Sequence, residues 1–219
     1  MPRGRRRSWL DRPVAWQPGR LGGRVVAADI NTQFLTGLAD NIEVRPLDIR
    51  IEAPEPDTYD VVHCRALLTH LRDPLAALRR MAAALRPGGV LLAEEPDYGL
   101  TAFSGHPDAE WATNHAHRVF AVLSAAERMH PYLGRRLPGM IIDVGLEFTD
   151  GEIESSIARF GDLAFEIQQL SMDGAGSALV AAGIMTEAEH ARATAVMSSP
   201  STVLTTVSLV ATWGRRPST

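Results

Sequence analysis

An α/β fold with a mostly parallel sheet is the architecture that this sequence predicts, on two observations. Between residues 24 and 97, short apolar runs alternate with helical patterns, and several of these runs end in an acidic residue. Alternation of strands and helices at short spacing is typical of a doubly wound sheet with helices on both faces. The length of 219 residues suits one such domain with a modest appendage.

The first half of the domain contains four expected strands and two expected helices. The strands are short runs rich in β-branched residues: 24–29, 41–47, 59–64 and 90–94. A short helix is predicted over 32–39, with Asn31 or Thr32 as its N-cap. A second helix is predicted over 74–85, because Leu78 and Ala82 share one face with other apolar residues.

The second half is predicted to be richer in helix. The expected helices are 109–128, 134–144, 160–171, 176–182 and 187–197. A strand is expected over 147–155, and a β-branched run over 202–213 closes the chain as a further strand.

The charge is unevenly distributed along the chain. All 22 basic residues are arginine, and residues 1–20 carry six of them against Asp11 alone, a local charge of +5 within a total of −4. We interpret residues 1–20 as an irregular basic arm and residues 21–219 as the domain. Such an arm can contact nucleic acid, but a different explanation is given below.

Other features exclude several classes of protein. The single cysteine, Cys64, excludes an internal disulfide framework and a zinc site built on cysteines. No apolar run approaches the roughly 18 residues of a membrane span, and the N-terminus lacks the apolar core of a secretory signal. We therefore expect no membrane partner and a cytoplasmic location.

Two acidic residues at strand ends are candidate ligands for a nucleoside. Asp29 follows the strand 24–29, where a carboxylate can accept both ribose hydroxyls; capping of the next helix is an equal alternative. Asp48 follows the next strand and could accept an adenine amine while Ile49 packs on the ring. A solvated turn aspartate is the commoner role of such a residue.

The stretch from residue 59 to 97 carries the most specific motif. It reads YDVVHCRALLTHLRDPLAALRRMAAALRPGGVLLAEEPD, with an L-x-H-L helix, an L-R-P-G-G turn and an acidic strand end. This pattern resembles the Rossmann-like core of class I S-adenosylmethionine-dependent methyltransferases, close to the ubiquinone and menaquinone methyltransferases. Pro87 ends a helix, and the two glycines after it permit an abrupt entry into a strand.

The resemblance implies a cofactor, S-adenosylmethionine, and the residues that bind it. Asp29 and Ile30 would hold the ribose and adenine, and Asp48 and Ile49 the adenine. Cys64 and Arg65 would face the methionine end. Cys64 is not expected to act as a nucleophile, because methyl transfer to a small molecule needs none. Arg65 could neutralise a carboxylate or, in the interpretation that we favour, pair with Asp97.

The substrate side is predicted from the same resemblance. His70 is the candidate catalytic base, although a histidine packed between helix and sheet is the commoner case. Further candidate groups are acidic: Glu94, Glu95 and Asp97. Residues 103–136 are interpreted as a substrate cap inserted after the fifth strand of the family. His115 and His117, two apart on a helix, make a poor metal pair, and no metal is expected.

The family also requires a first strand and a glycine-rich loop before residue 24, and residues 1–20 contain neither. A permitted back-translation of these residues, shifted by one base, reads CLEVGAGAGSIARWLGSRV, which resembles the missing motif. We therefore hypothesise a frameshift in residues 1–20, with the reading frame restored near residues 21–23. It also explains the high density of arginines in this segment. Since the first strand is central in this fold, we expect weak or absent cofactor binding and poor stability.

Three functional interpretations remain at this stage. The preferred one is methyl transfer to a small-molecule acceptor; a homodimer is left open and a nucleic-acid partner is not expected. The alternative is a non-catalytic remnant that acts as an interaction module through its basic arm. A nicotinamide-dependent oxidoreductase is disfavoured by the L-R-P-G-G turn and by the absence of a Tyr-x-x-x-Lys pair in a chain without lysine.

Overall fold

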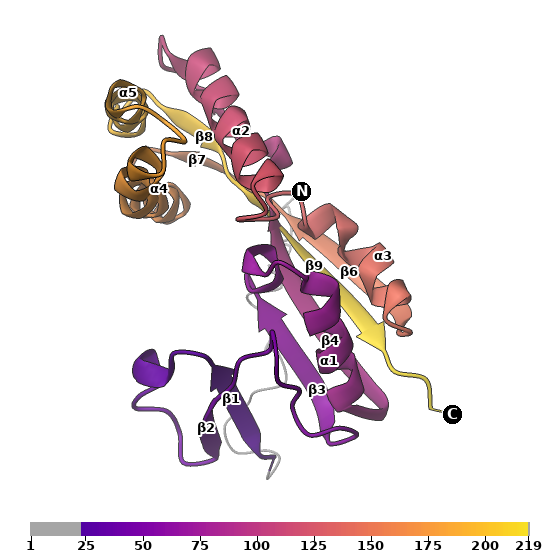
Figure 1. Ribbon diagram of the computed structural model, residues 1–219. Helices are drawn as coiled ribbons and strands as arrows, with labels where there is room; N and C mark the ends of the chain where they lie inside the picture. Colours follow the sequence, from indigo (N-terminus) through magenta and orange to yellow (C-terminus); the bar gives the residue numbers. More distant parts are fainter. Residues whose placement is uncertain (1–22, 219) are drawn as a thin grey trace, which may run out of the picture. The chain divides into compact units, whose positions relative to one another are not determined.

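The computed structural model describes residues 23–218 (Figure 1). The predictions of an irregular arm, a missing first strand and a missing glycine loop therefore lie outside the described residues. The chain divides into two compact units, which are described separately: Met1–Asp48 and Ile49–Thr219.

The first unit contains a two-stranded parallel sheet. Strand β1 (Val25–Asp29) pairs with β2 (Ile42–Pro46) in the register Val25 to Ile42, which confirms both predicted strands. The predicted helix over 32–39 was too long. Only the 3-10 helix η2 (Thr32–Phe34) forms, with Asn31 as its N-cap, and Gly37 then takes a left-handed conformation (φ 68°) that no helix continues through.

The second unit is built on a four-stranded sheet of order β3-β4-β9-β6. Its strands are β3 (Tyr59–Arg65), β4 (Leu85–Asp97), β6 (Glu147–Glu154) and β9 (Ser208–Arg215). Strands β3 and β4 are parallel, whereas β9 runs antiparallel to both of its neighbours. The predicted L-R-P-G-G turn is an irregularity at the start of β4: Gly88 has φ 78°, and the register with β3 jumps there.

Two helices cover one face of this sheet (Figure 1). Helix α1 (Pro74–Ala84) begins at Pro74, with the Asp73 side chain accepting a hydrogen bond from Ala76 N. Helix α3 (Leu137–Asp143) follows the 3-10 helix η5 (Gly134–Arg136). It packs so closely on β9 that a Cβ at Gly214 would lie 2.5 Å from Ile141 Cγ2. The core of the unit therefore lies between these helices and the sheet.

A smaller antiparallel sheet of order β5-β8-β7 carries the remaining helices. Its strands are β5 (Ala102–Ser104), β7 (Ile157–Arg159) and β8 (Val203–Thr205). The predicted closing strand 202–213 is thus two strands, β8 and β9, in different sheets. The helices are α2 (Ala109–Ala125), α4 (Leu163–Ala181) and α5 (Glu187–Met197), the last as predicted.

Helix α4 corrects the prediction of two separate helices at 160–171 and 176–182. Glycine is a poor helix former, yet Gly174 and Gly176 both lie inside α4. Gly176 is buried against α5, where a Cβ would lie 2.0 Å from Nε2 of His190. A larger residue here would have to displace the His190 side chain, so packing against α5 favours glycine at this point of the helix.

Candidate functional site

The first unit places the predicted ribose ligand on an exposed turn. Asp29 ends β1, and its Oδ1 accepts a hydrogen bond from Asn31 N at 2.8 Å. Asn31, not Asp29, caps the following 3-10 helix. Ile30 beside it is 64% exposed. An exposed carboxylate and an exposed apolar neighbour therefore lie at this strand end.

The predicted adenine residues are consecutive in the chain, and the division into two units falls between them. Asp48 is half-buried at the end of the first unit. Ile49 begins the second unit and is 8% exposed, and its carbonyl accepts a hydrogen bond from Arg80 Nη1 at 3.3 Å. Ile49 therefore presents little free surface to a ring.

Cys64 and Arg65 end strand β3, as the motif predicted. Cys64 is buried, and burial together with the nearby carboxylates Glu95 and Glu94 raises the pKa of its thiol far above the usual range. The thiol is therefore inert, in line with the expectation that it is no nucleophile. Arg65 is exposed, with its Nε 3.8 Å from Glu94 Oε2.

Glu94 lies opposite Arg65 in the parallel register of β3 and β4 and is 1% exposed. Its Oε1 lies 2.9 Å from Nε2 of His63, and its Oε2 accepts no hydrogen bond among the described residues. His63 was not among the predicted site residues. The period of two along β3 could have found it, since His63 and Arg65 must share one face.

Asp97 does not pair with Arg65, so that prediction was wrong. The carboxylate is held by Arg135 instead, with Nε to Oδ2 and Nη2 to Oδ1 both at 2.6 Å, and the backbone N of Arg135 adds a third contact. Burial raises the pKa of Asp97, but the hydrogen bonds from Arg135 and Gly99 outweigh it and hold the pKa below its usual value. Because Asp97 and Arg135 are 38 residues apart in the chain, no local sequence pattern predicts that they form an ion pair.

Glu95 is fully buried on the opposite face of β4 from Glu94. Its Oε1 accepts hydrogen bonds from Leu67 N (3.0 Å) and Leu68 N (2.8 Å), and its Oε2 from Thr69 N (3.1 Å). These residues begin the 3-10 helix η3 (Leu68–His70). Glu95 is therefore occupied by backbone groups and is not a free substrate ligand.

His70, the candidate base, ends η3 with an exposed side chain. Partial desolvation by its surroundings lowers the pKa of its imidazole and so favours the neutral ring. A neutral, accessible imidazole can accept a proton, and His70 is not the packed histidine that was the commoner alternative. The carboxyl ends of β3 and β4 thus lie close to Arg65, Glu94 and η3.

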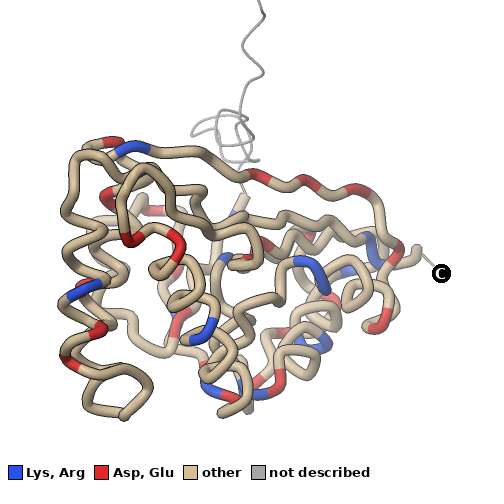
Figure 2. The backbone as a smooth tube through the Cα atoms, turned by 90° about the horizontal axis from the view of Figure 1, so that it is seen from above, with Lys and Arg blue, Asp and Glu red and all other residues tan. Residues whose placement is uncertain are grey.

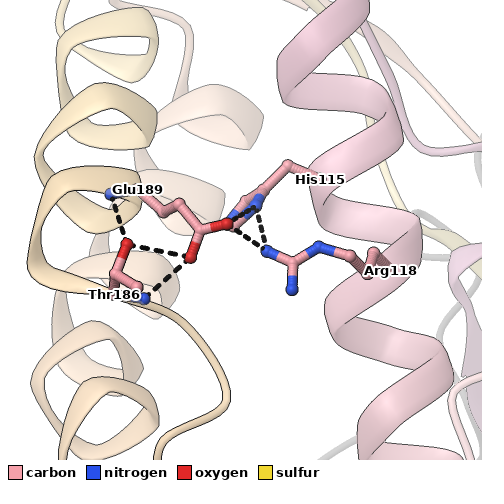
Figure 3. Close-up of polar contacts among 4 residues, drawn as sticks. All are labelled: His115, Arg118, Thr186 and Glu189. Carbon is pink, nitrogen blue, oxygen red and sulfur yellow. Dashed lines mark hydrogen bonds and ion pairs between the residues drawn. The ribbon is translucent and has the colours of Figure 1, made fainter.

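Helix α2 lies in the segment predicted as a cap and contacts α5, a helix that the prediction did not include in the cap (Figure 3). Arg118 on α2 donates to Glu189 on α5 at 2.6 Å and to Nδ1 of buried His115 at 2.9 Å. Thr186 and Glu189 form a capping box at the start of α5. Helices α4 and α5 therefore belong to the same end of the unit as residues 103–136.

Three further properties concern the part of the chain that the structure describes. No group of three or more histidine, cysteine or acidic side chains is arranged to hold a metal ion there. Acidic and basic residues are both spread over the described backbone (Figure 2). None of the described helices combines the length and apolar content that crossing a bilayer requires.

Comparison with known sequences places the motif in a family. A family model described as a methyltransferase domain matches residues 7–147, or 141 of the 219 residues. Ubiquinone biosynthesis O-methyltransferase of Xanthomonas campestris pv. campestris is 35% identical over 83 residues, covering 33% of this chain and 34% of that protein. Methyltransferase str3 of Strobilurus tenacellus is 31% identical over 121 residues, covering 53% and 42%. The chain thus spans less than half the length of these curated relatives.

Solved structures resemble this one over most of its length. A candidate methyltransferase of Bacillus halodurans superposes with a TM-score of 0.56 at 14% identity, covering 89% of this chain and 84% of that one. The [4+2]-cyclase SpnF superposes with a TM-score of 0.52 at 14% identity, covering 89% and 67%. Likeness at such low identity shows a common Rossmann-like fold.

Proposed function

Because the chain belongs to the class I S-adenosylmethionine-dependent methyltransferases, we propose that it transfers a methyl group from that cofactor to a small-molecule acceptor. The observation that carries the proposal is the carboxyl end of β3 and β4, where Arg65, Glu94 and the His70 loop lie together. Ligands of open α/β sheets bind at the carboxyl ends of the strands.

The residues that we assign to the cofactor suit its adenosine part. The exposed carboxylate of Asp29 suits ribose hydroxyls, and exposed Ile30 suits the adenine ring. Asp48 can accept a hydrogen bond from the adenine amine. Ile49 is almost fully buried, so only the edge of its side chain can contact the adenine ring. In the second unit, the exposed guanidinium of Arg65 suits the carboxylate of the methionine part, and the buried thiol of Cys64 only supports it.

When bound, the cofactor supplies a methyl group that its sulfonium already activates. The protein then has to orient the acceptor and, for an acceptor that ionises, to remove a proton. His70 is the group that we assign to proton removal, because its imidazole is neutral and exposed beside the strand ends. The helices α2, α4 and α5 act as the cap that excludes water from the acceptor.

We also propose that this chain binds the cofactor weakly, because residues 1–20 lack the glycine-rich sequence that the family places before β1. Calorimetric titration with S-adenosylhomocysteine tests this. A dissociation constant in the high-micromolar range that Asp29→Ala weakens about tenfold, while Asp40→Ala does not, supports both the site and its impairment. Low-micromolar binding contradicts the impairment, and binding unaffected by Asp29→Ala contradicts the site.

The acceptor class needs its own assay. Formation of S-adenosylhomocysteine is measured with a panel of small hydroxyl, amine and carbon acceptors, and separately with protein and RNA. Turnover with a small molecule alone is the expected result. Absence of both cofactor binding and turnover, together with salt-sensitive RNA binding that requires residues 1–20, would favour the alternative of a non-catalytic interaction module.

A further inference from the structure

Glu95 is a buried carboxylate to which the reaction assigns no task. It is 0% exposed, and its two oxygens accept the three backbone hydrogen bonds from Leu67, Leu68 and Thr69. Burial raises the pKa of the Glu95 carboxyl, and the hydrogen bonds from the Leu68, Thr69 and Leu67 amides oppose that rise. Among the described residues its hydrogen-bond donors are these backbone groups, and no arginine or histidine is paired with it.

The loop of residues 66–70, whose amides bind Glu95, requires hydrogen bonds from other segments to keep its conformation. It leaves β3 through Ala66, whose φ of 49° lies in the left-handed region that side chains other than glycine rarely adopt. Ala66 N donates to Glu94 O at 2.8 Å, which fixes the start of the turn. The Glu95 carboxylate fixes the next three amides, and His70 follows directly. A strained turn of this kind persists only where its surroundings determine it.

The same loop is also hydrogen-bonded to part of the predicted cap segment. Thr69 Oγ1 donates to His130 O at 2.9 Å, and His130 N donates to Thr69 O at 2.8 Å. The next residue, Pro131, accepts a hydrogen bond from Tyr98 N at 2.9 Å. A continuous set of hydrogen bonds therefore runs from the Glu95 carboxylate through Thr69 to the backbone of residues 130 and 131.

We propose that Glu95 is a positioning residue: its carboxylate sets the place of His70 and of the segment 130–131 over the carboxyl end of β4. The inference rests on the proposed function for its catalytic consequence, since it assigns His70 to the acceptor side. Its structural part stands independently. Glu95 touches neither acceptor nor cofactor, and it acts through the backbone amides that it binds.

The direct test is hydrogen exchange in the full chain. Glu95→Gln keeps the shape but turns an NH₂ group toward amides that are themselves donors, so Leu67, Leu68 and Thr69 are expected to lose at least about tenfold in protection. Glu94→Gln is the matched control: it changes the neighbouring buried carboxylate on the other face and should leave these three amides protected. Unchanged protection in folded Glu95→Gln would overturn the proposal.

A second variant covers the case in which Glu95→Gln does not fold. Glu95→Asp retains the charge but is one methylene shorter, so it should weaken protection of the three amides less than Glu95→Gln and leave β4 protected. Exchange identical to that of the unchanged protein at all three amides would contradict the inference.

Two further measurements test the catalytic consequence of the positioning role of Glu95. In Glu95→Asp the NMR titration of His70 should move toward the ordinary histidine value, and kcat should fall about tenfold while S-adenosylhomocysteine affinity changes less than twofold. Unchanged kcat with disturbed exchange contradicts the catalytic consequence. If the unchanged protein shows no turnover, the proposed function fails, and exchange and the His70 titration still decide the role of Glu95.

Discussion

Thr69 and His130, 61 residues apart in the chain, exchange two hydrogen bonds: the Thr69 hydroxyl donates to the His130 carbonyl, and the His130 amide donates to the Thr69 carbonyl. Thr69 lies in the loop after β3, and His130 lies in the segment after α2. The candidate base and the cap are therefore linked through the backbone, so that a displacement of one displaces the other.

Replacement of Thr69 by valine is expected to weaken this link. The hydroxyl is buried, and its loss leaves the His130 carbonyl without that donor, so the free energy of unfolding should fall by about 1 kcal/mol. Urea denaturation measures the change. Thr58→Val is the control, because the Thr58 hydroxyl bonds to Pro56 O at an exposed site where water replaces it. Equal effects of the two variants would contradict the prediction.

Arg135→Ala should destabilise the protein and change its acid sensitivity. Removing the guanidinium leaves the buried Asp97 with only backbone donors, which we expect to cost about 2 kcal/mol at pH 7. The lowered pKa of Asp97 means that its stabilising contribution is present above the unfolded value near 3.8 and is lost as pH falls through the lower folded value.

Urea denaturation of this variant at pH 7 and at pH 3 checks both statements. The difference between Arg135→Ala and the unchanged protein should shrink at the lower pH. Arg136→Ala serves as the control, since the neighbouring arginine is exposed and forms no ion pair with any described residue. A difference that grows on acidification would contradict the assigned role of Arg135.

Gly134→Ala tests the close approach of η5 to the sheet. A Cβ at this position would lie 2.8 Å from Glu95 O and 2.8 Å from Val210 Cγ2, and the backbone atom cannot move aside cheaply. We expect a loss of about 1–3 kcal/mol in the free energy of unfolding. Gly139→Ala, in helix α3 with open space around it, should instead be neutral or stabilising by up to about 1 kcal/mol. If Gly139→Ala lowered the free energy of unfolding more than Gly134→Ala, the close packing of η5 on the sheet would be refuted.

His115 should make stability depend on pH. Its ring is buried between Trp111, which stacks on it, Arg118 and Glu189, and desolvation followed by the Arg118 charge lowers its pKa, against the opposing effect of Glu189. Because Nδ1 accepts from Arg118, the proton of the neutral ring is on Nε2.

The sign follows from the lowered pKa. The unfolded chain takes up this proton near the ordinary value of about 6.5, before the folded protein does, so stability is full above that pH and falls as pH drops through the folded value. Chemical denaturation from pH 7.5 to 5 measures the slope. His115→Gln should remove this part of the slope, and His117→Gln, on the same helix, should retain it. A slope unchanged by His115→Gln would exclude the assignment.

Much of the second unit could be predicted from local patterns. The alternation of β-branched runs with helical patterns and the L-R-P-G-G turn indicated parallel strands whose ends carry polar groups, and helix α5 was predicted to the residue. The failures have specific causes. Helix α4 passes through Gly176 because α5 packs on it, and Asp97 pairs with Arg135 because η5 folds back over β4.

The sequence by itself determined the family and the strand ends that carry Asp29 and Arg65, because these follow from short-range periodicity and a motif of fixed spacing. Only the tertiary structure decided what the acidic run at the end of β4 does. Glu94 lies beside His63 and Arg65, Glu95 binds the η3 amides, and Asp97 binds Arg135. Alternation along a strand sends neighbouring carboxylates to opposite faces, and their partners are brought there by segments distant in the chain.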